Sequence, residues 1–99
     1  MKIPGELPDF LDLLAAALAS GDGVYSALKR VVPRLNGLLG DELTTTLRAL
    51  EFGSSLEFEL TQLAKRLPQQ QLMETCNKLT LAIRRGTPLW RILVEQAEA

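Results

Sequence analysis

Arginine and tryptophan gather around Gly86, and these side chains are the ones best suited to contact another molecule. Arg84 and Arg85 precede the glycine, and Trp90 and Arg91 follow it by four and five residues. Trp and Arg are enriched at the centres of protein interfaces. The cluster therefore predicts a contact patch for a protein partner. For Trp90 itself, burial in the core is the interpretation favoured over the interface, because Trp more often lies largely buried.

Tyr25 joins this prediction through the alignment of three expected turns. The fourth residue after the turn glycine is Tyr25 in the first turn, Glu57 in the second and Trp90 in the third. A position that accepts Glu in one turn is expected near solvent in all three. The alignment therefore predicts that Tyr25 and Trp90 are partly exposed.

Acid–base, metal and thiol chemistry find little support in the chain. No His is present, which removes the usual general base near neutral pH and the commonest metal ligand. The single Cys76 has no partner for a disulfide, a zinc site or thiol catalysis. Its spacing from Leu72 and Leu79 predicts a reduced core cysteine, which suits a cytoplasmic compartment. Neither an enzyme nor a bound cofactor is expected.

Two pairs of carboxylates could hold a divalent cation, Asp9 with Asp12 and Asp41 with Glu42. Both pairs are expected near the start of a helix, where the helix dipole favours negative charge. The dipole is the preferred explanation, so no metal ligand is assigned. A cation site stays open as the alternative.

The composition fits one small helical domain. Of the 99 residues, 46% are hydrophobic, and the abundance of Leu, Ala, Glu, Gln and Arg favours helices. Eleven basic and twelve acidic side chains nearly cancel, which argues against nucleic acid as a partner. No apolar run approaches the ~20 residues that are needed to span a bilayer.

Leucine periodicity and turn residues predict six helices with one shared core. Glycine allows the positive φ that stops a helix at Gly21, Gly53 and Gly86, and Ser54 with Glu57 matches a capping box. The expected helices cover residues 8–20, 24–32, 39–52, 55–67, 68–85 and 88 onward. One leucine from each helix is predicted to meet the others: Leu14, Leu28, Leu43, Leu60, Leu79 and Leu93.

The three turn glycines are spaced by 32 and 33 residues, so the chain repeats a helical hairpin three times. A period of this size is typical of a solenoid, whose units stack to bury a shared core. Three hairpins could equally close into a six-helix bundle, with short loops making neighbouring helices antiparallel. The spacing alone leaves both architectures open.

Several short motifs follow one another in a recognisable order: Leu7-Pro8-Asp9, Ala19-Ser20-Gly21, Ala27-Leu28, Glu42-Leu43, Gly53-Ser54-Ser55-Leu56, Gly86-Thr87-Pro88-Leu89 and Ile92-Leu93. Their order and spacing resemble the cytoplasmic domain of the type II secretion F family, above all its tight-adherence (Tad) pilus branch. This family contains the inner-membrane platform proteins of type II secretion and type IV pilus machines. The resemblance implies an antiparallel six-helix bundle made of three helical hairpins over residues 7–98. Residues 1–6 are interpreted as a leader from the sequence itself, because they carry no apolar core long enough for a signal peptide.

The resemblance also implies a function. The domain would face the cytoplasm at the bacterial inner membrane and couple the assembly ATPase to pilin assembly. Its partners would be that ATPase and a sister platform subunit or a second copy of itself, while transmembrane anchors would lie outside this chain. Many relatives carry an acidic residue before the third glycine, where this chain has Arg84 and Arg85. A free soluble helical adaptor with unrelated protein partners is the alternative, and a small DNA-binding helical domain is a weaker third interpretation.

Overall fold

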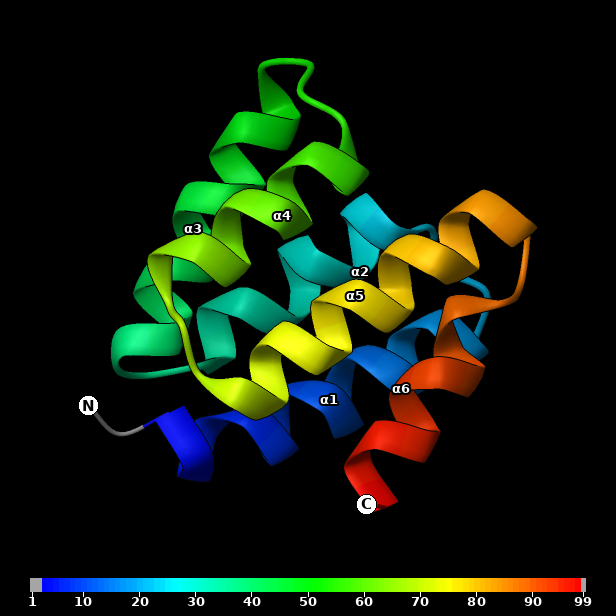
Figure 1. The fold of residues 1–99 in the computed structure, drawn as a ribbon, viewed down its shortest axis with the longest axis horizontal. Helices are drawn as coiled ribbons and strands as arrows, with labels where there is room; N and C mark the ends of the chain where they lie inside the picture. Colours follow the sequence, from blue (N-terminus) through cyan, green and yellow to red (C-terminus); the bar gives the residue numbers. More distant parts are fainter. Residues whose placement is uncertain (1–2, 99) are drawn as a thin grey trace.

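All regular structure in the described part of the chain is helical. The computed structural model describes the backbone of residues 3–98 and the side chains of residues 6–96. The predictions of an all-α class and of six α-helices are confirmed within that range. The elements in Figure 1 are α1 (Ile3–Ala19), α2 (Val24–Val31), the short 3-10 helix η1 (Val32–Arg34), α3 (Leu38–Glu51), α4 (Leu56–Arg66), α5 (Gln70–Arg85) and α6 (Leu89–Glu98).

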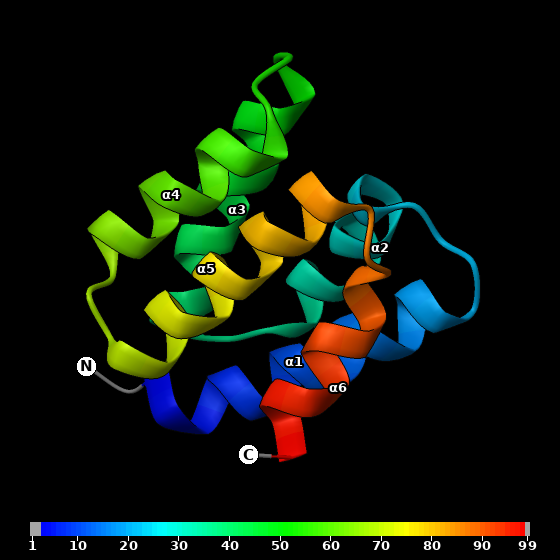
Figure 2. The ribbon, with the colours of Figure 1, turned by 45° about the vertical axis from the view of Figure 1, so that its right-hand side comes forward.

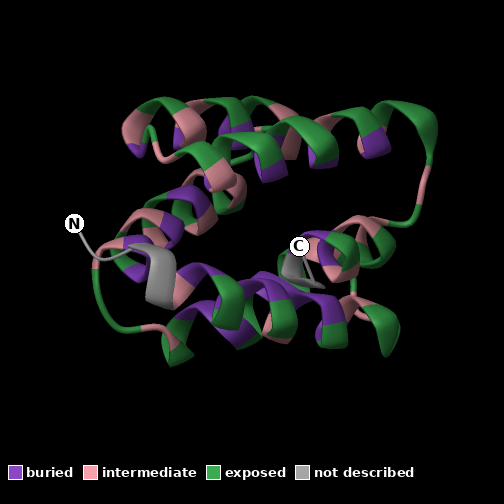
Figure 3. Cartoon of the chain, turned by 60° about the horizontal axis from the view of Figure 1, so that its bottom comes forward, coloured by how far each residue is buried: buried purple, intermediate pink, exposed green. Residues whose placement is uncertain are grey.

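The first and last helices, α1 and α6, pack against each other more extensively than any other pair. Helix α4 contacts α3 and α5, α5 also contacts α6, and α2 and α3 both contact α1. The helices thereby surround one interior, as Figures 1 and 2 show from two directions. In Figure 3 the buried residues lie on the helix faces that point toward this interior. The domain measures 33 × 33 × 22 Å.

The three glycine turns lie along one edge of the molecule, at the top and right of Figure 1. Two side-chain contacts link them. Tyr25, just after the first turn, donates a hydrogen bond to Glu51 before the second, and Arg84 before the third turn pairs with Glu57 after the second. We call residues 18–30, 48–59 and 81–91 the turn side. The opposite side holds the η1–α3 and α4–α5 connections.

The turn glycines have the backbone conformation that the sequence predicts. The φ angles are 103° at Gly21, 99° at Gly53 and 72° at Gly86, all in the region that disfavours residues with a Cβ. After Gly86, the N–H of Thr87 bonds the carbonyl of Ala82 at 3.0 Å, which closes the end of α5. The predicted helix stops at the three glycines are confirmed.

Helix α1 begins at Ile3 and not at Pro8, so the predicted start is wrong. Pro8 lies in the second turn, where its missing N–H removes one hydrogen bond of the helix without ending it. Residues 3–6, expected as part of a leader, therefore belong to the helix. Glu6 is the acidic residue of the first turn, so the dipole explanation for Asp9 and Asp12 does not hold.

The start of α4 is capped by Ser55, one residue later than the capping box predicts. The Ser55 hydroxyl accepts a hydrogen bond from the N–H of Phe58 at 3.1 Å. Ser54 instead donates its hydroxyl hydrogen to the Glu59 carboxylate at 2.7 Å, which satisfies a buried acid. The predicted box of Ser54 with Glu57 is therefore wrong, because the neighbouring serine occupies the cap position.

Two other helix ends differ from the proline signals. Helix α2 gives way at Val32 to η1, and Pro33 lies inside that 3-10 turn instead of ending the helix. Helix α5 begins at Gln70, two residues after Pro68, because the side chain of Gln69 caps it. The Gln69 amide oxygen accepts from the N–H of Leu72 at 2.7 Å. Proline thus indicates a helix boundary only to within a few residues. At α5, the side-chain cap determines the residue at which the helix begins.

The start of α3 is capped by a residue far away in the sequence. Its N-cap residue, Gly37, has φ 113° and offers no side chain. Glu6 from α1 takes this place, because its Oε1 accepts from the N–H of Leu39 at 3.3 Å. The φ of 113° favours glycine at this position, and a Cβ there would lie 2.9 Å from both carboxylate oxygens of Glu6, so the acid would have to move. This contact ties α1 to α3 on the opposite side.

The six leucines predicted to form one core are all buried, with exposed fractions of 8% or less. They belong to a single apolar cluster to which every helix contributes. Cys76 is buried in the same cluster, as expected from its helical spacing. The helical faces assigned from leucine periodicity are confirmed.

Candidate interaction site

Trp90 and Arg91 form an exposed pair at the start of α6. Trp90 keeps 39% of its surface exposed, so its predicted partial exposure is confirmed and the core interpretation is wrong. The Cζ atom of Arg91 lies 5.8 Å from the centroid of the Trp90 ring, within the range of a cation–π contact. The pair presents a large apolar surface beside a positive charge, which is the composition of an interface anchor.

Arg84 and Arg85 lie at the end of α5, just before the same turn, and both are exposed. They differ in their contacts. Arg84 donates from Nε to the carboxylate of Glu57 on α4, whereas Arg85 has no ion pair among the described residues. The structure therefore places Arg84, Arg85 and Arg91 on the two sides of the Gly86 turn. The Arg84 side chain contacts Glu57 on α4 and does not join the pair of Trp90 and Arg91.

Tyr25 lies at the start of α2 and is exposed to 39%, as the alignment of turns predicts. Its hydroxyl donates to Oε2 of Glu51 at 2.8 Å, and the Nζ of Lys29 lies 5.4 Å from its ring centroid. The hydrogen bond to the Glu51 carboxylate favours the neutral phenol and raises the pKa of Tyr25. Tyr25 and Trp90 thus carry the same motif, an exposed aromatic ring with a basic side chain over it.

Two further aromatic residues lie exposed on the turn side, and sequence reasoning missed both. Phe52, the residue before Gly53, is 92% exposed, and Phe58 in the first turn of α4 is 56% exposed. Only Phe10, of the five aromatic residues in the chain, is buried. Neither phenylalanine occupies one of the leucine positions in the helical pattern. This was the sequence signal that could have predicted their exposure.

The charges of the turn side favour a negatively charged partner. Its three segments hold six basic and four acidic side chains. Some of the acids are already engaged, since Asp22 pairs with Arg30 at 3.1 Å and Glu57 pairs with Arg84. Basic side chains are left without an ion pair among the described residues: Lys29, Arg48, Arg85 and Arg91.

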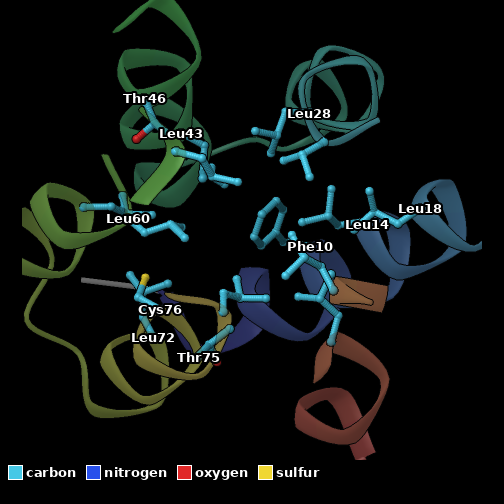
Figure 4. Close-up of a pocket in the computed structure, with 16 residues that line it drawn as sticks. Phe10, Leu14, Leu18, Leu28, Leu43, Thr46, Leu60, Leu72, Thr75 and Cys76 are labelled. Carbon is cyan, nitrogen blue, oxygen red and sulfur yellow. The ribbon is translucent and has the colours of Figure 1, made fainter. Parts of the chain in front are cut away.

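An apolar cavity of about 40 Å³ lies at the centre of the core. Side chains from all six α-helices line it, and the Phe10 ring points toward its middle (Figure 4). Four of the lining residues are only half-buried, namely Leu18, Val24, Leu56 and Leu89. Each of them stands next to one of the three glycine turns. The part of the wall that is nearest to solvent therefore lies on the turn side, and we call it the mouth of the cavity.

The cavity wall contains the single cysteine. Cys76 is 3% exposed, and burial raises the pKa of its thiol from 9.0 to about 11. The thiol is therefore neutral at physiological pH, which makes it a poor nucleophile and a poor metal ligand. Cys76 acts as a small apolar part of the wall.

The two carboxylate pairs have different surroundings. Asp9 and Asp12 line an open cleft of about 450 Å³ together with Glu6 and Arg34. Glu42 accepts a hydrogen bond from Nε of Arg66 at 2.6 Å, so it is engaged in an ion pair between α3 and α4. Within the described residues no group of three or more Cys, Asp or Glu side chains is arranged to hold a metal ion.

Comparison of the chain with models of protein families, with curated proteins and with solved structures finds no match. None of the helices in residues 3–98 has the length and apolar character needed to cross a bilayer. The resemblance of the short motifs to the type II secretion F family therefore stays a proposal, and the candidate site rests on its own geometry.

Proposed function

We propose that the chain is the cytoplasmic interaction domain of an inner-membrane platform protein in a Tad pilus, type IV pilus or type II secretion machine. It couples the assembly ATPase to pilin assembly through contacts and performs no chemistry. The order of the short motifs supports this proposal, as do the six helices and the three glycine turns. The finer arrangement, an antiparallel bundle of three hairpins over residues 7–98, is part of the same proposal.

The observation that carries the proposal is the exposed Trp90 with Arg91 held over its ring. The exposed part of the ring adds no stability to the isolated domain, whereas burial against a partner removes that apolar area from solvent. Tyr25 with Lys29 repeats the arrangement at the start of α2. Arg85 adds a charge that no described residue neutralises. Together they form a surface suited to binding a protein.

In this proposal the partners are the assembly ATPase and a sister platform subunit or a second copy of the domain. Nucleic acid is not among them. The transmembrane helices belong to parts of the parent protein outside residues 1–99, and the domain faces the cytoplasm. The partly buried ion pair of Arg66 with Glu42, which joins α3 and α4, supports transmission of a displacement as a rigid unit.

The test uses the full-length parent protein and its assembly ATPase in a pull-down. We expect Trp90→Ala and Arg91→Glu to weaken capture of the ATPase or of the sister subunit while circular dichroism stays unchanged. Lys65→Glu is the matched control, because Lys65 is also exposed and lies in the last turn of α4. Normal capture by both patch variants would remove the patch from the proposal.

The complete reading frame gives an independent check. Apolar segments of ~20 residues elsewhere in the same protein are expected, because a platform must be anchored in the membrane. A reading frame without such segments contradicts the platform and favours the free soluble adaptor. In that case the same variants would affect other protein partners.

A further inference from the structure

We propose that the mouth of the central cavity is a pocket for one apolar side chain of an acidic amphipathic helix from a partner protein. This inference rests on the proposed function only in taking the turn side as the partner-facing surface. It adds the chemistry of the partner and the place where its anchor residue enters.

The cavity is suited to an apolar group and not to water. The surface that lines it is apolar, although Thr46, Thr75 and Cys76 are among the residues that form the wall. Both hydroxyls already donate to a backbone carbonyl one turn earlier, and both accept from another side chain, Arg66 in the first case and Gln96 in the second. A buried water needs two to four polar partners, which this wall does not offer.

The size of the cavity fits part of a side chain. About 40 Å³ is several times the ~10–15 Å³ that a single water requires by this measure, and far less than the ~150 Å³ of a cavity that admits benzene. The end of a Leu, Met or Phe side chain meets this limit, whereas a lipid chain does not. Half-buried Val24, Leu56 and Leu89 at the mouth would contact the rest of the anchor.

The surface around the mouth matches an acidic helix. Lys29, Arg85 and Arg91 have no ion pair among the described residues, so each can form an ion pair with a carboxylate of the partner. Helix-in-groove recognition uses apolar anchors at helical spacing on one face, with polar groups at the edges. The exposed rings of Tyr25 and Trp90 stand beside the same helix starts and can cover the flanks of a bound helix.

An anionic membrane is the rival occupant, because exposed aromatic and basic residues also suit a lipid surface. One observation favours the helix. The apolar lining is recessed in the core, where a flat bilayer cannot reach it.

The experiment selects binders from a displayed library of amphipathic helices with randomised surface positions, using the folded full chain as bait. We expect enriched helices to carry one Leu, Met or Phe with Asp or Glu one turn away. Val24→Phe, which fills the mouth, should weaken their binding about tenfold. Arg85→Glu should weaken it as well, while Lys65→Glu, also an exposed change but on α4, should leave it unchanged.

Xenon provides a probe of the pocket that does not depend on the mouth variants. Dissolved xenon should shift the methyl resonances of Leu14 and Leu60, which line the cavity, and a saturating selected helix should suppress those shifts. Enriched helices without acidic residues, full binding by Val24→Phe, or xenon shifts that persist with the helix bound would each overturn the proposal. Binding to phosphatidylserine vesicles that depends on Phe52 and Arg85, with no helix selected, would overturn it in favour of a membrane.

These outcomes distinguish failure of the pocket from failure of the proposed function. A selected acidic helix together with no capture of the assembly ATPase would support the pocket and contradict the platform function. Capture of the ATPase that is insensitive to Val24→Phe, with no helix selected, would support the platform function and contradict the pocket.

Discussion

The two sides of the molecule use their polar side chains for different purposes. On the opposite side they are partly buried and connect helices: Glu6 caps α3, and Arg66 reaches both Glu42 and Thr46. On the turn side the contacts are exposed, as between Arg84 and Glu57, and large rings lie in water beside them. Exposed pairs contribute little stability. The opposite side therefore holds the fold together, while the turn side is available to bind.

The buried polar network between α5 and α6 belongs to the stabilising part. Gln96 is 3% exposed, donates from Nε2 to the Thr75 hydroxyl at 3.1 Å, and accepts from the ammonium group of Lys78. Buried polar groups that lose their partner carry a desolvation cost. No comparable buried network exists among the described residues of the turn side, apart from Ser54 with Glu59.

The largest expected effect comes from truncating a core residue of α4, and it is compared with truncation of an exposed residue of the same helix. Leu63→Ala should lower the free energy of unfolding by about 2–5 kcal/mol, because Leu63 is 1% exposed and its loss leaves a cavity. Phe58→Ala should change it by less than about 0.5 kcal/mol, because the ring is mostly in water. Urea unfolding of both variants measures the contrast. A large cost for Phe58→Ala would assign this ring to the core.

Alkaline pH should destabilise the domain through Cys76. The thiol pKa is raised to about 11 in the folded protein from 9.0, so the folded state holds the proton more tightly than the unfolded chain. This contribution is complete below pH 9 and is lost as the pH rises through about 11, up to roughly 3 kcal/mol. Unfolding of wild type and of Cys76→Ala should be compared at pH 8 and pH 11. An equal loss in both proteins would show that the thiol plays no part.

Removing the long-range cap should cost less. Glu6→Ala leaves the start of α3 without its acceptor, and we expect a loss of about 1 kcal/mol in the free energy of unfolding. Arg84→Ala removes an exposed contact of the turn side and should cost less than about 0.5 kcal/mol. If the two losses are equal, the distinction between the sides is wrong.

Glycine substitutions isolate backbone strain from packing. A Cβ on Gly53 meets no atom within 4 Å, so Gly53→Val tests only the φ of 99° and should cost roughly 1–2 kcal/mol. Gly23→Ala is the matched control, because that residue has φ −69° and equally open space. Thermal unfolding should separate the two variants, and an unchanged melting temperature for Gly53→Val would contradict the helix stop.

Local signals in the sequence predicted the helix faces and the turn glycines. Leu14 and Leu79 recur with their neighbours at helical spacing, and Gly86 follows such a face directly, so no distant contact is needed to interpret them. The start of α1 was missed because Pro8 was interpreted as the first turn of the helix, although it lies inside the helix. The cap of α3 by Glu6 was missed because it joins residues far apart in the sequence, and helical periodicity gives no information about such contacts.

The candidate site was predicted in part for the same reason. The exposure of Trp90 follows from comparing equivalent turn positions, which requires the sequence alone. Phe52 and Phe58 were missed because their residue type indicates burial, and the cavity mouth depends on how α2, α4 and α6 are spaced. The direction of Arg84 toward Glu57 likewise arises only when α4 and α5 pack together.

The smallest expected effect concerns Tyr25, whose pKa is raised, like that of Cys76, but at the surface. The hydrogen bond to Glu51 is the main cause, so Glu51→Gln should lower the titration midpoint of Tyr25 toward 10, as followed by tyrosinate absorbance. Tyr25→Phe should leave the free energy of unfolding almost unchanged, because the bond is exposed. A binding defect in Tyr25→Phe with unchanged stability would assign the hydroxyl to the contact surface. A stability loss as large as that of Glu6→Ala would instead make Tyr25 part of the framework that holds α2 to α3.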